Sequence, residues 1–185
     1  MDDPLPSQLL LQLVLILLNA FFACTEIAVI SLNDAKLKRD AEAGNKKAQL
    51  LMRLTGQPAR FLATIQVGIT IAGFLGSAFA ADNFSDRLTK WMMGIGVGLP
   101  EATLDTISVI VITLVLSFFT LVLGELVPKR IAMKKADPIA KAVGGLIYFL
   151  SKVAAPVVWL LTASTNGILR LLRMNPNADE EQVTE

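Results

Sequence analysis

One short motif in this 185-residue chain combines a glycine, a carboxylate and a proline at a spacing that could bind a cation. It reads Gly124-Glu125-Leu126-Val127-Pro128-Lys129. Proline has no backbone N–H, so within a helix Pro128 cannot donate to the carbonyl of Gly124, four residues earlier. The motif therefore offers a free carbonyl beside the carboxylate of Glu125. Carbonyl and carboxylate oxygens are the ligands of hard cations such as Mg²⁺ and Ca²⁺.

Glu125 and Glu26 are the two acidic residues that lie within long apolar segments of the chain. A charged residue at such a position is costly, and it usually serves a function. Simpler interpretations are also open. Glu125 could pair with Lys129 or Arg130, and Glu26 could be satisfied by a basic loop residue or a backbone group. Thr25, next to Glu26, could supply a hydroxyl or carbonyl ligand.

A row of hydroxyl residues precedes the motif. Thr113, Ser117 and Thr120 lie at helical spacing from one another and from Gly124, so one face of a regular helix would carry them all. The hydroxyls could hydrogen-bond to carbonyls of their own helix, or they could line a polar path. The residues that could support a cation site are Glu26, Ser117, Thr120 and Pro128.

The composition restricts the class of protein. Hydrophobic residues make up 54% of the chain and charged residues 18%, and the mean hydropathy is +0.58; soluble domains are about half apolar and about a quarter charged. The net charge of +1 gives no strong field that would attract nucleic acid. One cysteine excludes an internal disulfide, and the lack of histidine excludes a histidine-ligated metal. We expect an integral membrane protein that carries out no covalent chemistry, and so is not an enzyme.

Three apolar segments reach the length of about 20 residues that a membrane-spanning helix needs. They cover about residues 9–30, 61–81 and 107–127. In the second segment a small residue recurs at every fourth position, which predicts close packing against a neighbouring helix. These residues are Thr64, Gly68, Ala72, Gly76 and Ala80.

A fourth apolar stretch, residues 138–173, is less regular. Asp137 and Pro138 predict a helix N-cap followed by proline at the first helical position. Pro156 then interrupts the stretch, and basic residues follow at its far end. A full crossing would place those basic residues outside, so we interpret the stretch as interfacial or re-entrant helices rather than as a fourth span.

Basic residues are concentrated between the first and second spans and after the third. Between the second and third spans the only basic residues are Arg87 and Lys90. The positive-inside rule then places the N-terminus outside and the C-terminus in the cytoplasm. Residues 34–54 predict a juxtamembrane helix, which either lies on the inner leaflet or is a solvated connector. Residues 1–173 form the expected membrane domain, and the polar residues 174–185 begin a linker.

At this point the chain resembles the transmembrane domain of the CNNM/CorC family of magnesium transporters, often labelled haemolysin-like in bacteria. Three segments in this order carry the resemblance, which extends from about residue 8 to residue 173. They are Phe21-Phe22-Ala23-Cys24-Thr25-Glu26, Phe61-Leu62-Ala63-Thr64-Ile65-Gln66-Val67-Gly68-Ile69-Thr70 and Gly124-Glu125-Leu126-Val127-Pro128-Lys129.

The resemblance implies an all-α fold with three transmembrane helices and a belt of amphipathic or interfacial helices on the cytoplasmic side. It implies a homodimer in the lipid bilayer, here the bacterial inner membrane. CBS modules that bind adenine nucleotide would follow the linker. The implied ion ligands come from Thr25, Thr70, Gly73, Gly124 and Glu125. Many relatives have asparagine where Thr70 and Gly73 stand.

The function implied is export of Mg²⁺ by alternating access, with Na⁺ entry as the driving ion. A competing hypothesis belongs to a different class: a membrane anchor and ion sensor that regulates a partner protein without transport. Ion flux through the full-length protein separates the two, because a sensor would bind Mg²⁺ without moving it.

Overall fold

A computed structural model describes residues 5–172 and residue 174 of the chain. These residues form helices joined by short turns, without any strand among them, and the predicted all-α fold is confirmed. The elements in chain order are α1 (Leu5–Ile30), α2 (Asp34–Glu42), α3 (Lys46–Thr55), α4 (Pro58–Gly94), α5 (Glu101–Leu121), the π-helical segment η1 (Val122–Leu126), α6 (Val127–Lys134), α7 (Ala136–Val153) and α8 (Ala155–Leu171). Apart from Met174, the linker expected at 174–185 lies outside the described residues.

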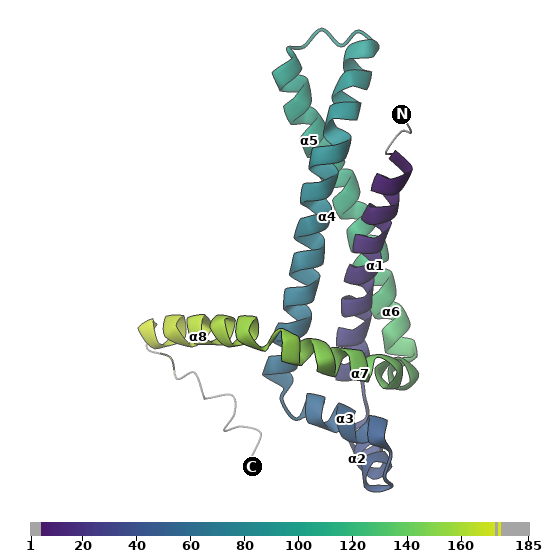
Figure 1. The fold of residues 1–185 in the computed structure, drawn as a ribbon, viewed down its shortest axis with the longest axis vertical. Helices are drawn as coiled ribbons and strands as arrows, with labels where there is room; N and C mark the ends of the chain where they lie inside the picture. Colours follow the sequence, from purple (N-terminus) through teal and green to yellow (C-terminus); the bar gives the residue numbers. More distant parts are fainter. Residues whose placement is uncertain (1–4, 173, 175–185) are drawn as a thin grey trace.

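Among the described residues, three helices are long and apolar enough to cross a membrane: α1, α4 and the continuous helix from Glu101 to Lys134 that contains α5, η1 and α6. The pair α7 and α8 reaches that length and hydropathy only when the two are taken together. The three helices run side by side in Figure 1, with the start of α1 and the turn between α4 and α5 at one end and α2, α3 and α7 at the other. Only 17–33% of the residues in their most apolar windows are buried. Lipid or a second copy must therefore cover most of their surface.

The second span is longer than the sequence indicated. α4 has 37 residues where about 21 were expected from 61–81, which gives a length of about 55 Å against a hydrocarbon core of about 30 Å. Its second half is polar and pairs with the start of α5, where Thr89 Oγ1 donates to Ser108 Oγ at 2.8 Å. The α4–α5 hairpin thus extends beyond the membrane, and hydrophobicity alone could not show this.

The expected juxtamembrane helix over 34–54 is two helices, and the single-helix prediction was wrong. Gly44 separates α2 from α3 with φ of +87°, a conformation that glycine adopts readily. The side chain of Asn45 then caps α3 by accepting hydrogen bonds from the N–H groups of Lys47 and Ala48. The apolar residues keep helical spacing across this break, because each of the two helices buries an apolar face.

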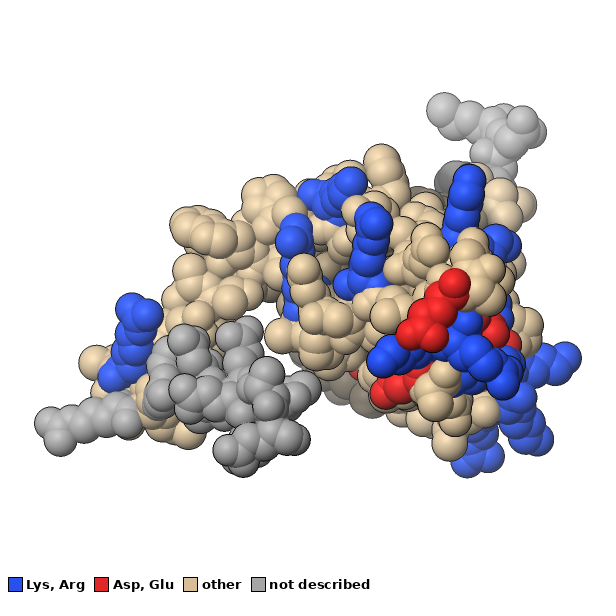
Figure 2. Space-filling view, turned by 90° about the horizontal axis from the view of Figure 1, so that it is seen from below, with Lys and Arg blue, Asp and Glu red and all other residues tan. Residues whose placement is uncertain are grey.

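The largest hydrophobic core does not lie among the spans. It lies at the end of the bundle where α2, α3 and α7 pack, a region that we call the belt. Its buried side chains come from the inner end of α1, from α2 and α3, from the start of α4, and from α6 and α7. Packing is close: a Cβ added to Gly144 of α7 would stand 2.9 Å from Leu51 Cδ2 of α3. Figure 2, which looks at this end, shows lysine and arginine side chains spread over it and a group of acidic side chains among them.

Ion pairs connect α2 to α7 within the belt. Lys36 Nζ lies 2.8 Å from Asp137 Oδ2, and Lys141 Nζ lies 3.0 Å from Asp40 Oδ2 and 3.3 Å from Asp137 Oδ2. The hydrogen bond from Lys36, together with that from Lys141, holds the pKa of the Asp137 carboxyl below its ordinary value. Asp137 is not the helix N-cap that the sequence predicted, because α7 already begins at Ala136. The N-cap is Lys135, which makes no side-chain cap bond.

α7 and α8 form a bent pair, with a 66° change of direction at Ala154. Pro156, near the start of α8, lies at this break, as the sequence indicated. Figure 1 shows both helices running crosswise to the three spans at the end that carries α2 and α3. This arrangement agrees with interfacial helices, and their position relative to the bilayer stays a prediction.

The small residues of α4 face α1. Thr64, Ala72, Gly76 and Ala80 are buried, and a Cβ added to Gly68 would stand 2.6 Å from the ring of Phe22 in α1. Small side chains thus allow the two helices to approach closely, as predicted.

Gly68→Ala should therefore destabilise the protein, even though alanine favours a helix over glycine. The added methyl overlaps the Phe22 ring, and overpacking of this kind costs about 1–3 kcal/mol. Gly73→Ala is the matched control on the same helix, because a Cβ there meets no atom within 4 Å. Thermal melting of the purified variants in detergent measures the difference. Equal stability of the two would show that the Phe22 ring moves aside and that the close approach at Gly68 does not contribute to stability.

Candidate cation site

The Gly124–Glu125 motif lies in a π-helical turn, η1, inside the third span. The N–H of Val127 bonds to the carbonyl of Val122, five residues earlier rather than four. Pro128 follows directly, and in a regular α-helix its ring would press on the Gly124 carbonyl. The wider turn relieves this contact. Single π turns inside α-helices occur frequently at functional sites.

The carbonyl of Gly124 is indeed free to bond outside its own helix, and the side chain of Asn19 in α1 occupies it. Asn19 Nδ2 donates to Gly124 O at 3.1 Å, and Asn19 is 3% exposed. Glycine allows this close approach, because a Cβ would stand 3.1 Å from Asn19 Nδ2 and 3.3 Å from the carbonyl oxygen of Ile16. Asn19 was not predicted from the sequence. The available signal was an amide inside an apolar span, where polar groups need partners.

A lysine ammonium lies between the two acidic residues that the sequence singled out. Lys129 Nζ is 2.9 Å from Glu125 Oε1 and 3.2 Å from Glu26 Oε2. The contact with Glu125 is a hydrogen bond. The contact with Glu26 lacks hydrogen-bond geometry, so the buried Glu26 Oε2 keeps an unsatisfied acceptor. Helix α1 and the π turn thus bring both carboxylates to one cation, and Glu125 adopts the ion pair with Lys129 that was one of its open interpretations.

The other predicted ligands are less closely tied to this group. Thr25 is fully buried next to Glu26, but its hydroxyl donates to the carbonyl of Phe21 in its own helix at 2.7 Å. The half-buried Thr70 accepts from Gln66 within α4 at 3.4 Å. Gly73 has open space beside it. Within the described part of the chain, no hydrogen bond or ion pair links Thr70 or Gly73 to the carboxylates.

The row of hydroxyls does not face the bundle as one stripe. Ser117 is exposed, whereas Thr113 and Thr120 are partly buried. Leu116 takes the buried position instead of Ser117. The three hydroxyls lie in the regular helix α5, and the π turn that follows changes their register relative to Gly124. Ser117 is exposed in this chain, and its part in a cation site stays a prediction.

A line of amides leads from the Gly124 carbonyl toward the opposite end of α1. Asn19, Gln12 and Gln8 are spaced to share one helix face. Gln8 Nε2 donates to Asn83 Oδ1 of α4 at 2.7 Å. Gln12 is 6% exposed, and neither atom of its amide has a hydrogen-bond partner. Buried amides without partners are costly, and each needs an explanation.

This arrangement can bind a cation through oxygens of different kinds. No group of three or more His, Cys, Asp or Glu side chains gathers within residues 5–172 and 174. The two carboxylates at Lys129 would therefore need carbonyl or amide oxygens to complete a coordination shell, and the same helices carry such oxygens at Gly124 and Asn19. Oxygen donors of this kind suit a hard cation.

The three apolar spans and the polar site within them define an all-helical integral membrane protein. The chain matches the Cyclin M transmembrane N-terminal domain over residues 10–185, and it belongs to this family. The resemblance to the CNNM/CorC family seen in the sequence is confirmed.

Curated relatives are similar over nearly all of this chain. UPF0053 protein sll0260 of Synechocystis sp. is 36% identical over 158 residues, which cover 85% of this chain and 35% of that protein. UPF0053 protein YhdP of Bacillus subtilis is 27% identical over 94% of this chain and 38% of its own length. A protein of Haemophilus influenzae named polyamine export protein is 27% identical over 92% of this chain and 39% of its own length. The chain thus spans between a third and two fifths of these relatives.

Proposed function

We propose that this chain is the membrane domain of a cation exporter and that Mg²⁺ is its substrate. One observation carries the proposal: the carboxylates of Glu26 and Glu125, from different helices, share the ammonium of Lys129 between the helices of an apolar bundle. A site that holds a lysine ammonium between two acids has the charge to hold a free cation in its place. The Gly124 carbonyl, which bonds to Asn19 outside its own helix, would supply a further oxygen ligand.

In this proposal Lys129 acts as a counterion that yields to the substrate. When Mg²⁺ enters between Glu26 and Glu125, the lysine moves aside, and Asn19 rotates so that its amide oxygen replaces its NH₂ group at the site. When the ion leaves, Lys129 returns and neutralises part of the negative charge, so the empty site never exposes two unpaired carboxylates to the membrane interior.

The ion would then cross the outer half of the bundle along the line of amides. Gln12 has no partner in the present arrangement, and its oxygen could replace a water of the passing ion. Alternating access would open this line to the outside and close the inner entrance. The uneven distribution of basic residues supports an outside N-terminus and a cytoplasmic belt in a bacterial inner membrane. Na⁺ entry as the driving force, a homodimer, and regulation by adenine nucleotide on CBS modules belong to the same proposal.

A second candidate substrate is a polyamine, and a specific observation favours it. The group that the site holds in this structure is a primary ammonium, bound by Glu125 and Glu26. Polyamines present this same group, and the relative from Haemophilus influenzae is named a polyamine export protein. The outer line of amides could accept hydrogen bonds from further ammonium groups of an extended substrate.

Transport by the full-length protein in proteoliposomes tests both candidates. We expect Mg²⁺ to leave the compartment facing the belt when Na⁺ is supplied on the opposite side, and we expect spermidine to compete with it if both use the same carboxylates. Export of spermidine without Mg²⁺ movement would replace the first candidate by the second. Binding of Mg²⁺ without flux under any gradient would contradict transport and favour the anchor and sensor hypothesis.

A further inference from the structure

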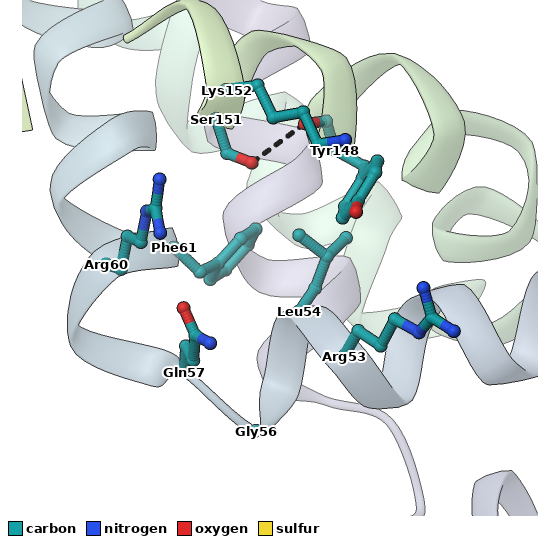
Figure 3. Close-up of a pocket in the computed structure, with 9 residues that line it drawn as sticks. All are labelled: Arg53, Leu54, Gly56, Gln57, Arg60, Phe61, Tyr148, Ser151 and Lys152. Carbon is teal, nitrogen blue, oxygen red and sulfur yellow. Dashed lines mark hydrogen bonds between the residues drawn. The ribbon is translucent and has the colours of Figure 1, made fainter. Parts of the chain in front are cut away.

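A second polar site lies in the belt, where the connection between α3 and α4 meets α7. The cavity has a volume of about 430 Å³. Figure 3 shows the residues that line it, with the side chains of Arg53 and Arg60 on either side of the α3–α4 connection and Tyr148 and Lys152 facing them from α7. The lining consists of Arg53, Leu54, Gly56, Gln57, Arg60, Phe61, Tyr148, Ser151 and Lys152.

The charge of this pocket is positive and uncompensated. Three of its lining residues are basic and none is acidic. Elsewhere in the belt, Lys36 and Lys141 are paired with aspartates, whereas no ion pair involves Arg53, Arg60 or Lys152 anywhere in residues 5–172. Three cations around one cavity repel one another, and an anion between them would relieve this repulsion.

The polar groups of the pocket are suited to a phosphate. Each arginine presents a planar fork of N–H donors that matches phosphate oxygens. Lys152 is held over the Tyr148 ring, with Nζ 4.6 Å from the ring centroid. This contact holds the lysine on the α7 side of the cavity. Gln57 adds a neutral donor at the connection itself.

The deepest lining residues are apolar. Leu54 is 5% exposed and Phe61 is 3% exposed, although both border the cavity. Phe61 also starts the apolar part of the second span, so we expect the pocket to lie near the membrane surface, where the span meets the belt. A ligand that carries a phosphate and an apolar body would therefore satisfy both parts of the pocket. Basic pockets at the cytoplasmic ends of membrane helices bind anionic lipid headgroups.

We propose that the pocket between Arg53, Arg60 and Lys152 binds the phosphate headgroup of an anionic membrane lipid. The lipid would join α3 and the foot of α4 to α7, three elements that share few other polar contacts there. The chemistry recognised is a phosphate ester, which a soluble phosphate compound also offers. The apolar lining and the membrane position favour the lipid. This proposal does not depend on which cation the spans transport.

The test titrates phosphatidylglycerol into the full-length protein in neutral detergent and counts bound lipid by native mass spectrometry. The variant Arg53→Gln/Arg60→Gln/Lys152→Gln removes the three cations of the pocket. The matched control Lys38→Gln/Lys46→Gln/Lys47→Gln removes three exposed charges of α2 and α3 outside it. We expect the pocket variant to lose affinity about 100-fold, because each of its three basic groups at the headgroup contributes about 1 kcal/mol or about fivefold. The three lysines of the control do not line the pocket, so we expect their removal to change the affinity by no more than about twofold.

Two further measurements make the outcome decisive. Arg53→Lys/Arg60→Lys keeps the charge but removes the planar forks, and we expect it to lose affinity several-fold while melting at the wild-type temperature in phosphatidylcholine. Glycerophosphate, the same phosphate ester without acyl chains, should compete poorly. Equal losses in the pocket variant and the control would overturn the proposal in favour of diffuse surface charge. Competition by glycerophosphate as strong as that of the lipid would overturn the lipid as the source.

Discussion

Replacing Glu125 by glutamine should abolish both Mg²⁺-dependent stabilisation and Mg²⁺ flux. The change preserves the size of the side chain and one carbonyl oxygen, but it removes one of two carboxylates that face the resident cation. A divalent ion inside a membrane protein needs this charge, since little water remains to screen it. Loss of a direct ligand should exceed the roughly 10–100-fold loss of affinity that outer-shell partners of a metal cause when they are changed.

Mg²⁺ protection against heat gives the binding measurement, because a ligand at 100 times its Kd adds about 2.7 kcal/mol to the free energy of unfolding. Glu101→Gln is the matched control: it makes the same change at the opposite end of the third span, in the first turn of α5. If correctly folded Glu125→Gln protein keeps wild-type protection and flux, Glu125 serves only as the ion-pair partner of Lys129.

Replacing Lys129 by glutamine should have the opposite effect on ion binding. Without the ammonium, Glu26 and Glu125 face each other with no counterion, so the empty protein should melt at a lower temperature. The vacant position then favours any added cation, and we expect Mg²⁺ to stabilise this variant more than it stabilises the wild type. Transport should fall, because the ion would be held tightly and the empty site could not be neutralised.

Lys141→Gln provides a close control, because Lys141 also lies between two carboxylates, those of Asp40 and Asp137. That group joins α2 to α7, so its loss should lower stability and leave Mg²⁺ flux unchanged. A Lys129→Gln protein that loses stability without any gain in Mg²⁺ protection would contradict the exchange of lysine for ion and would leave a purely structural ion pair.

Local chemistry made much of the fold and part of the site predictable. The spans follow from hydrophobic length, and the free carbonyl of Gly124 follows from the missing N–H of Pro128. The residue that takes this carbonyl, Asn19, lies 105 positions away, and its approach depends on how α1 packs on the third span. No rule of local spacing contains that information.

Two errors in the prediction have a common physical cause, which is the assumption of regular helices. Ser117 was assigned to the face of Gly124 on the basis of α-helical spacing, and the π turn between them breaks that relation. Residues 34–54 were assigned to one helix because their apolar positions kept helical spacing, although Gly44 turns the chain. Hydrophobic periodicity reports which residues are buried and does not report such interruptions.

The π turn offsets the two halves of the third span. It holds one extra residue, so the residues after Leu126 are rotated by about 100° about the helix axis from where a regular α-helix would place them. Closing the turn, or passing it toward Leu121, would bring the Pro128 ring back against the Gly124 carbonyl. Pro128 thus pins the wide turn beside Glu125, and the carbonyl that Asn19 binds stays directed out of its own helix.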